Sequence, residues 1–110
     1  MDVTQIELPA TGEPEVLRVV RRTVREPGPE EVAVRVEATG VSFAEQQMRR
    51  GKYFDQPPFP FVPGYDLVGT VVGTGPQAAP ALVGRRFAAV TKTGAWASHL
   101  LVDADRKSVV

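Results

Sequence analysis

The sequence predicts a small, mainly β Greek-key barrel that contains one short α-helix. Its 110 residues, 43% of them apolar, are enough for a single domain with its own core. Ten glycines and ten prolines divide the chain into short segments, and most of these segments are rich in valine, which favours strands. Only one segment has the period of a helix. Many short strands beside one helix are typical of a small barrel.

The first third of the chain is expected to form three strands. Residues 3–8 and 16–24 are rich in β-branched side chains that roughly alternate with polar ones, and a turn rich in proline and glycine joins them. Residues 31–37 follow a Pro-Gly-Pro breaker and alternate strictly. The side chains that this alternation places in the core are Val32, Val34 and Val36.

A single helix is expected at about residues 43–51. Ser42 and Glu45 have the spacing of a capping box, in which the serine and the glutamate each bond to the other's backbone at the start of a helix. Gly51 is a natural left-handed terminator. The helix is therefore about two turns long.

The second half of the chain is expected to supply three more strands. Residues 52–64 contain four prolines and four aromatic residues, which predicts an apolar loop rather than a linker. Strands follow at 66–73, 86–91 and 95–102, with a surface loop at 77–83 and a single helical turn at 103–106. The further side chains expected in the core are Val68, Val71, Phe87, Val90 and Trp96.

Charge and cysteine content exclude several classes of protein. The 13 basic and 13 acidic residues leave no net charge, so a general binder of nucleic acid or anionic membranes is not expected. Without cysteine the chain has no disulfide and no thiolate metal site, which is compatible with the cytoplasm. No apolar run approaches the roughly 18 residues of a membrane span. We expect a cytoplasmic domain with neither nucleic acid nor membrane among its partners.

Two motifs have more ordinary explanations than catalysis. Residues 73–78 match G-x-G-x-x-A after a strand, as in a dinucleotide fingerprint, but Pro76 and Pro80 leave no room for the helix that would hold a pyrophosphate. We interpret this segment as a turn. His99 is the only histidine and has no partner at the spacing of a metal ligand, so we expect a structural role for it. Spacing alone reveals no catalytic constellation.

Three blocks, taken together, resemble a known family. They read E-A-T-G-V-S-F-A-E-Q-Q-M-R-R-G-K-Y from Glu37, P-F-P-F-V-P-G-Y-D-L-V-G-T-V from Pro58 and G-A-W-A-S-H-L-L-V-D-A-D from Gly94. In order and spacing they resemble the N-terminal GroES-like domain of medium-chain dehydrogenases/reductases. Within that superfamily they look most like the zinc-independent quinone oxidoreductase branch. The resemblance implies a mainly β, GroES-like Greek-key barrel.

The resemblance also implies roles for individual residues. Tyr53 matches a tyrosine that faces the nicotinamide and the substrate, so it is the expected catalytic residue and also a cofactor-binding one. Ser42 and Tyr65 stand where zinc alcohol dehydrogenases have a metal-binding cysteine and histidine, so no catalytic zinc is expected. The Ser42 hydroxyl is still placed to bind the cofactor. Glu45 departs from the usual aspartate.

Complete members of the branch pair this barrel with a Rossmann domain, and NADPH passes a hydride to a quinone or an enone in the cleft between the two domains. Residues 1–110 are expected to form only the GroES-like domain, without the Rossmann domain, so the chain is expected to be inactive alone. Whether it is itself an enzyme stays open, as does a homodimer. The alternative is a stand-alone GroES-like binding or co-chaperonin-like module, which the short length and the apolar loop at 59–62 favour.

Overall fold

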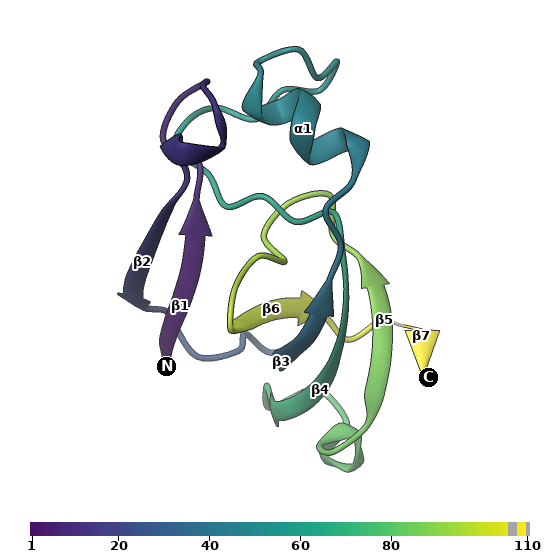
Figure 1. Cartoon of the computed structure of the whole chain (residues 1–110). Helices are drawn as coiled ribbons and strands as arrows, with labels where there is room; N and C mark the ends of the chain where they lie inside the picture. The colour runs from purple at the N-terminus through teal and green to yellow at the C-terminus, as the bar shows by residue number, and fades with distance from the viewer. Residues whose placement is uncertain (106–107, 110) are drawn as a thin grey trace.

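The computed structural model describes residues 1–105 and 108–109, which form a mainly β domain with two antiparallel sheets (Figure 1). The smaller sheet pairs β1 (Asp2–Glu7) with β2 (Arg18–Thr23). The larger sheet has the order β6-β3-β4-β5-β7. Its strands are β3 (Glu31–Thr39), β4 (Asp66–Thr74), β5 (Arg86–Val90), β6 (His99–Asp103) and β7 (Ser108–Val109). The remaining elements are α1 (Phe43–Arg49) and two 3-10 turns, η1 (Pro14–Val16) and η2 (Pro80–Leu82).

The predicted mainly β, GroES-like class is confirmed, but the two sheets do not close into a continuous barrel within the described residues. The smaller sheet meets the rest of the domain through single bridges, from Gln5 to Ala97 and from Leu8 to Phe61. The strand expected at 95–102 begins only at His99. Its first residues instead bond to other segments, since Trp96 N–H donates to the oxygen of Pro63 and Ser98 N–H donates to that of Thr4.

The single helix forms where the capping box predicts it, although it is shorter than expected. It ends at Arg49, with Arg50 as its C-cap, and Gly51 takes a φ of 72°. Of the helical turn expected at 103–106, residues 104 and 105 do form a turn, whereas Asp103 completes β6; residue 106 lies outside the described residues. In the part of the chain that the structure describes, no helix has the length and hydropathy needed to cross a bilayer.

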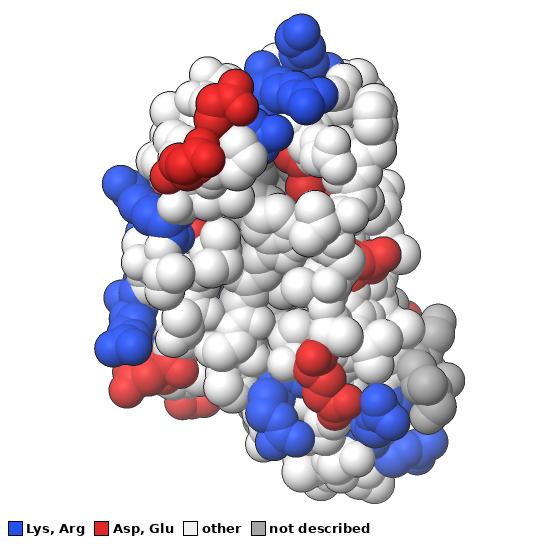
Figure 2. Space-filling model, viewed as in Figure 1, with Lys and Arg blue, Asp and Glu red and all other residues white. Residues whose placement is uncertain are grey.

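The core lies on the inner side of the larger sheet. Of the predicted core residues, Val32, Val34, Val71 and Phe87 are buried, whereas Val36, Val68 and Trp96 are only half-buried. The prediction for Val90 is wrong, because its side chain is 59% exposed. Seen from the side of Figure 1, the charged side chains lie mostly towards the edges of the molecule, and the middle of this face is uncharged (Figure 2).

One glycine fixes the approach of the 52–64 loop to the segment before β6. Gly64 has a φ of 121°, and a Cβ atom there would lie 2.4 Å from the backbone nitrogen of Trp96. Only glycine fits so close a contact between two backbones. This packing sets the positions of the next two residues, Tyr65 and Asp66, which begin the functional region.

Candidate functional site

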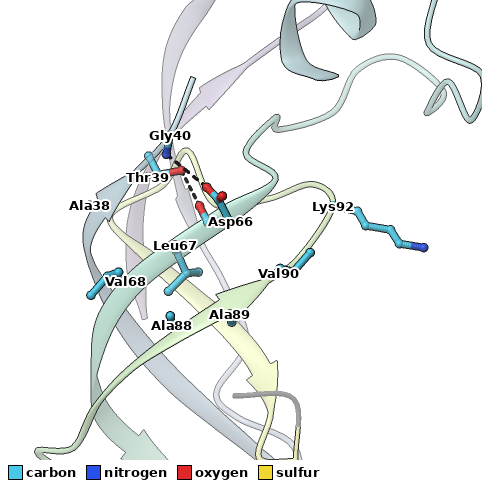
Figure 3. A pocket seen from close by; sticks show the side chains of 10 residues that line it. All are labelled: Ala38, Thr39, Gly40, Asp66, Leu67, Val68, Ala88, Ala89, Val90 and Lys92. Carbon is cyan, nitrogen blue, oxygen red and sulfur yellow. Dashed lines mark hydrogen bonds between the residues drawn. The ribbon is translucent and has the colours of Figure 1, made fainter. Parts of the chain in front are cut away.

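A cavity of about 740 Å³ lies where β3 ends, β4 begins and β5 ends (Figure 3). Its walls are mainly small and apolar, and Asp66 and Lys92 are the charged residues among those that line it. Such a volume suits a small organic molecule. The lining residues are Ala38, Thr39, Gly40, Asp66, Leu67, Val68, Ala88, Ala89, Val90 and Lys92.

Asp66 ties the end of β3 to the start of β4 at this cavity. The Thr39 hydroxyl donates to the backbone oxygen of Asp66 at 2.7 Å, and the Gly40 N–H donates to its Oδ1 at 3.3 Å (Figure 3). The carboxylate therefore holds backbone in place at the edge of the cavity. We assign Asp66 a positioning role on this ground.

Lys92 follows β5 in an unusual backbone conformation. Its φ of 67° lies in the left-handed region that non-glycine residues seldom adopt. The N–H groups of Thr91 and Lys92 both donate to the oxygen of Tyr65, at 2.7 and 3.0 Å, and these bonds hold the turn. The Lys92 side chain points away from the cavity (Figure 3).

Tyr53 lies in the loop after α1, and the structure brings it close to Tyr65. Its ring centroid is 4.8 Å from that of Phe54, and its side chain is half-buried. Desolvation raises the pKa of the Tyr53 phenol above its ordinary 10.0, and the neighbouring Tyr65 and Asp55 raise it further. A phenol keeps its proton at neutral pH, so Tyr53 is a hydrogen-bond donor, and its hydroxyl interacts with that of Tyr65.

Ser42 is the N-cap of α1, and its hydroxyl is already engaged. The hydroxyl donates to Glu45 Oε2 at 2.5 Å, and the Ser42 N–H donates to Oε1 of the same carboxylate at 3.1 Å. Its hydroxyl hydrogen is thus directed at Glu45. Neither Ser42 nor Tyr53 is among the residues that line the 740 Å³ cavity, although Ser42 follows Gly40 by two residues.

Comparison with known proteins identifies the family. Residues 28–108, about three quarters of the chain, match the family described as the alcohol dehydrogenase GroES-like domain. The chain belongs to this family. Its relatives place it more closely within the medium-chain dehydrogenase/reductase superfamily, among quinone oxidoreductase-like proteins.

Three relatives illustrate this. Quinone oxidoreductase-like protein 2 of Mus musculus is 38% identical over 76 residues, which cover 69% of this chain and 22% of the relative. The crystal structure of the human synaptic vesicle membrane protein VAT-1 homolog-like protein matches all of this GroES-like domain and 36% of its own chain, with a TM-score of 0.90 and 27% identity. The quinone oxidoreductase of Thermus thermophilus, solved also in complex with NADPH, matches with a TM-score of 0.78 and 32% identity over 96% of this domain and 31% of its own chain. The chain thus spans between about a fifth and about a third of the length of these relatives.

The donor atoms of this GroES-like domain do not fit a catalytic zinc. Ser42 offers a hydroxyl and Tyr65 a phenol, whereas zinc prefers thiolate or imidazole ligands. The Ser42 hydroxyl already donates a hydrogen bond to Glu45. Within residues 1–105 and 108–109 no three His, Cys, Asp or Glu side chains come together as a metal site. His99 lies on β6, where its Nδ1 is 3.0 Å from the Ser98 hydroxyl.

The segment that resembles a dinucleotide fingerprint is a turn, as predicted. The Gly75 N–H donates to the oxygen of Glu31 at 2.8 Å, and no helix follows before the three-residue η2. A Cβ atom on Gly75 would lie 1.7 Å from the oxygen of Gly28. Packing of two backbones therefore explains this glycine, and a pyrophosphate has no helix N-terminus here.

The cavity was not predicted from the sequence, although the exposure of one of its lining residues, Val90, follows from the alternation of its strand. Residues 86–90 read R-F-A-A-V, so strict alternation puts Val90 on the same face as Arg86 and opposite Phe87. The structure shows this arrangement, with Phe87 buried and Val90 exposed. The left-handed conformation of Lys92 had no comparable signal, because lysine has no preference for it.

Proposed function

We propose that this domain forms one wall of the substrate cleft of an NAD(P)H-dependent quinone or enone reductase that works without catalytic zinc. The observation that carries the proposal is Tyr53, a half-buried phenol beside Tyr65, in a domain whose relatives are quinone oxidoreductase-like. The cavity where β3 ends, β4 begins and β5 ends also offers small, apolar walls, but Tyr53 does not line it, so the proposal rests on Tyr53 and on the relatives.

In this proposal NADPH, when bound, supplies the hydride, and the residues of this chain bind and orient the acceptor and the nicotinamide. The role of Tyr53 is to donate a hydrogen bond to the acceptor oxygen as negative charge develops on it, and a donor placed beforehand in a desolvated site is the most effective kind. Ser42 presents an oxygen lone pair, because its hydrogen is directed at Glu45. It is suited to accept a hydrogen bond from the carboxamide of the nicotinamide.

The rest of the cofactor needs a second domain. Residues 73–78 form a turn without the helix that holds a pyrophosphate, so we infer that a Rossmann domain is the partner of this chain and that the chain alone is inactive. We also propose a cytoplasmic location, with which a sequence without cysteine is compatible.

The test is to join residues 1–110 to the Rossmann domain of a quinone oxidoreductase and to follow NADPH oxidation with 1,4-benzoquinone as the acceptor. We expect turnover by the joined protein, no turnover by the chain alone, and no zinc in the active protein by elemental analysis. Activity that requires stoichiometric zinc, or a joined and folded protein without activity, would contradict the proposal.

A further inference from the structure

Glu45 is a buried carboxylate without a cationic partner among the described residues. It exposes 3% of its surface, and both of its hydrogen-bond donors belong to Ser42. Arg49 lies one turn further along α1, but its guanidinium donates to the oxygen of Gly12 at 2.5 Å. Within the described ranges, no ion pair includes Glu45. A carboxylate accepts about four hydrogen bonds, and a buried one without an opposite charge is costly.

Glu45 lines a cavity of about 270 Å³ between α1, η1 and Trp96. A dry cavity of about 150 Å³ already holds a benzene ring, so this one has room for a ring and a short polar head. Beside the polar Glu45, Gln46 and Arg49, the lining is apolar. It consists of Leu8, Pro14, Leu17, Val41, Pro63 and Trp96.

A second apolar hollow, of about 610 Å³, adjoins this cavity along β1. The two share Leu17, Val41 and Trp96, and the uncharged middle of the face in Figure 2 is where β1 and β6 lie in Figure 1. The indole nitrogen of Trp96 donates to the oxygen of Gly40 at 2.9 Å, which fixes the ring that the two hollows share. Together the two adjoining hollows are called the trough here, with Glu45 among the residues that line the smaller one.

We propose that this trough binds a small amphipathic amine, with its ammonium against Glu45 and its apolar body against Leu17 and Trp96. A cation compensates the buried carboxylate, which an uncharged molecule of the same shape cannot do. The indole of Trp96 offers an apolar face to the body of the ligand. The cation that also lines this cavity, Arg49, donates to the oxygen of Gly12 rather than to Glu45. The larger hollow shares Thr39 with the cavity in Figure 3, but neither hollow contains Asp66, Lys92 or the β5 residues of that cavity. The inference therefore does not depend on the proposed reductase function.

Trp96 allows a direct test, because it is the only tryptophan of the chain. Benzylamine is titrated into residues 1–110 at neutral pH while tryptophan emission is recorded. We expect a saturable change at millimolar concentrations, binding at least tenfold weaker for Glu45→Gln, and binding at least tenfold weaker for benzyl alcohol, which has the same ring without the charge. Glu15→Gln removes an exposed carboxylate on η1 that lines neither hollow, and it is expected to bind as the wild type does.

A second variant keeps the test valid if Glu45→Gln does not fold. Leu17→Phe fills the trough and leaves the carboxylate in place, so binding is expected to weaken at least tenfold. Three results would each overturn the proposal: no saturable change with the wild type, equal affinity for benzyl alcohol, or unchanged binding in the folded variants of Glu45 and Leu17.

Discussion

The carboxylate of Glu45 accepts two hydrogen bonds from Ser42, one from the backbone N–H at 3.1 Å and one from the hydroxyl at 2.5 Å. This relationship starts α1 and also keeps a buried charge hydrogen-bonded. The position that resembles a metal ligand in zinc alcohol dehydrogenases thus has a structural task in this protein. Ser42 and Glu45 must be tested as a pair before any role of Ser42 toward a cofactor is measured.

We expect Ser42→Ala to lower the free energy of unfolding by about 1–2 kcal/mol, because the helix loses its N-cap and a buried carboxylate loses a donor. Urea unfolding followed by circular dichroism measures the change. Ser42→Thr keeps the hydroxyl and is expected to lose much less. An alanine variant as stable as the wild type would show that the capping box contributes nothing.

Glu7 joins β1 to β2 through Arg18 and Arg22, and its contribution depends on pH. Hydrogen bonds from Arg18, and then from Arg22, lower the pKa of this buried carboxyl below its ordinary 4.5. Because the pKa of Glu7 is lower in the folded protein, its ionised form stabilises the fold fully at pH values above the ordinary pKa of 4.5. This stabilisation is lost as the pH falls through the lower pKa that Glu7 has in the folded protein. We expect Glu7→Gln to cost about 1–3 kcal/mol near neutral pH.

Glu31 and Glu37 also have lowered pKa values, so they too make the stability of the protein depend on pH. Because the wild type and Glu7→Gln both retain these two residues, the difference in stability between the two proteins isolates the effect of Glu7. The stability difference between the wild type and Glu7→Gln is expected to shrink progressively below 4.5. Urea unfolding of the two proteins at a series of pH values measures it. A difference that stays constant into acid would mean that the ionised form of Glu7 is not the source of the stabilisation.

Gly73 and Gly75 belong to the segment that resembles a dinucleotide fingerprint, and replacing each of them tests whether backbone packing explains its glycines. A Cβ atom on Gly75 would meet the oxygen of Gly28 at 1.7 Å, whereas one on Gly73 would lie 3.8 Å from the Cβ atom of Ala33, an ordinary contact. We expect Gly75→Ala to destabilise the domain by about 1–3 kcal/mol or more, and Gly73→Ala to cost less than about 1 kcal/mol. Thermal unfolding of both variants decides this. Similar losses for both would refute the packing explanation.

The same substitution, valine to aspartate, can be compared at a buried position of β3 and at an exposed position of β5. Val34 is fully buried and Val90 is 59% exposed. Val34→Asp places an unpaired charge in the core and is expected to abolish cooperative unfolding, whereas Val90→Asp is expected to change stability by no more than about 0.5–1 kcal/mol. A calorimetric scan shows which variants keep a transition. A normal transition for Val34→Asp would mean that the inner face of β3 is not the core.

The success and the failure of sequence-based prediction here have a common physical origin. Local signals were sufficient where local bonds decide the structure, as for the capping box between Ser42 and Glu45. They were insufficient where distant segments compete for the same backbone. Trp96 was expected in a long strand, but Gly64 draws that segment to the preceding loop, and β6 begins three residues later. The cavity of Figure 3 arises from three strand ends that meet only in the fold.

Tyr53 is the residue on which the proposed reductase activity depends most. In the chain joined to a Rossmann domain, Tyr53→Phe removes a half-buried donor and keeps the ring beside Phe54, so we expect kcat to fall by about 10²-fold while the thermal midpoint is nearly unchanged. Because the pKa of Tyr53 is raised above 10.0, its protonation should not limit kcat at pH values well below that value. Steady-state rates of both proteins across this pH range provide the measurement. A phenylalanine variant with wild-type kcat, or a wild-type rate that falls with an apparent pKa well below 10.0 and does not fall in the variant, would show that Tyr53 does not donate to the acceptor in its neutral form.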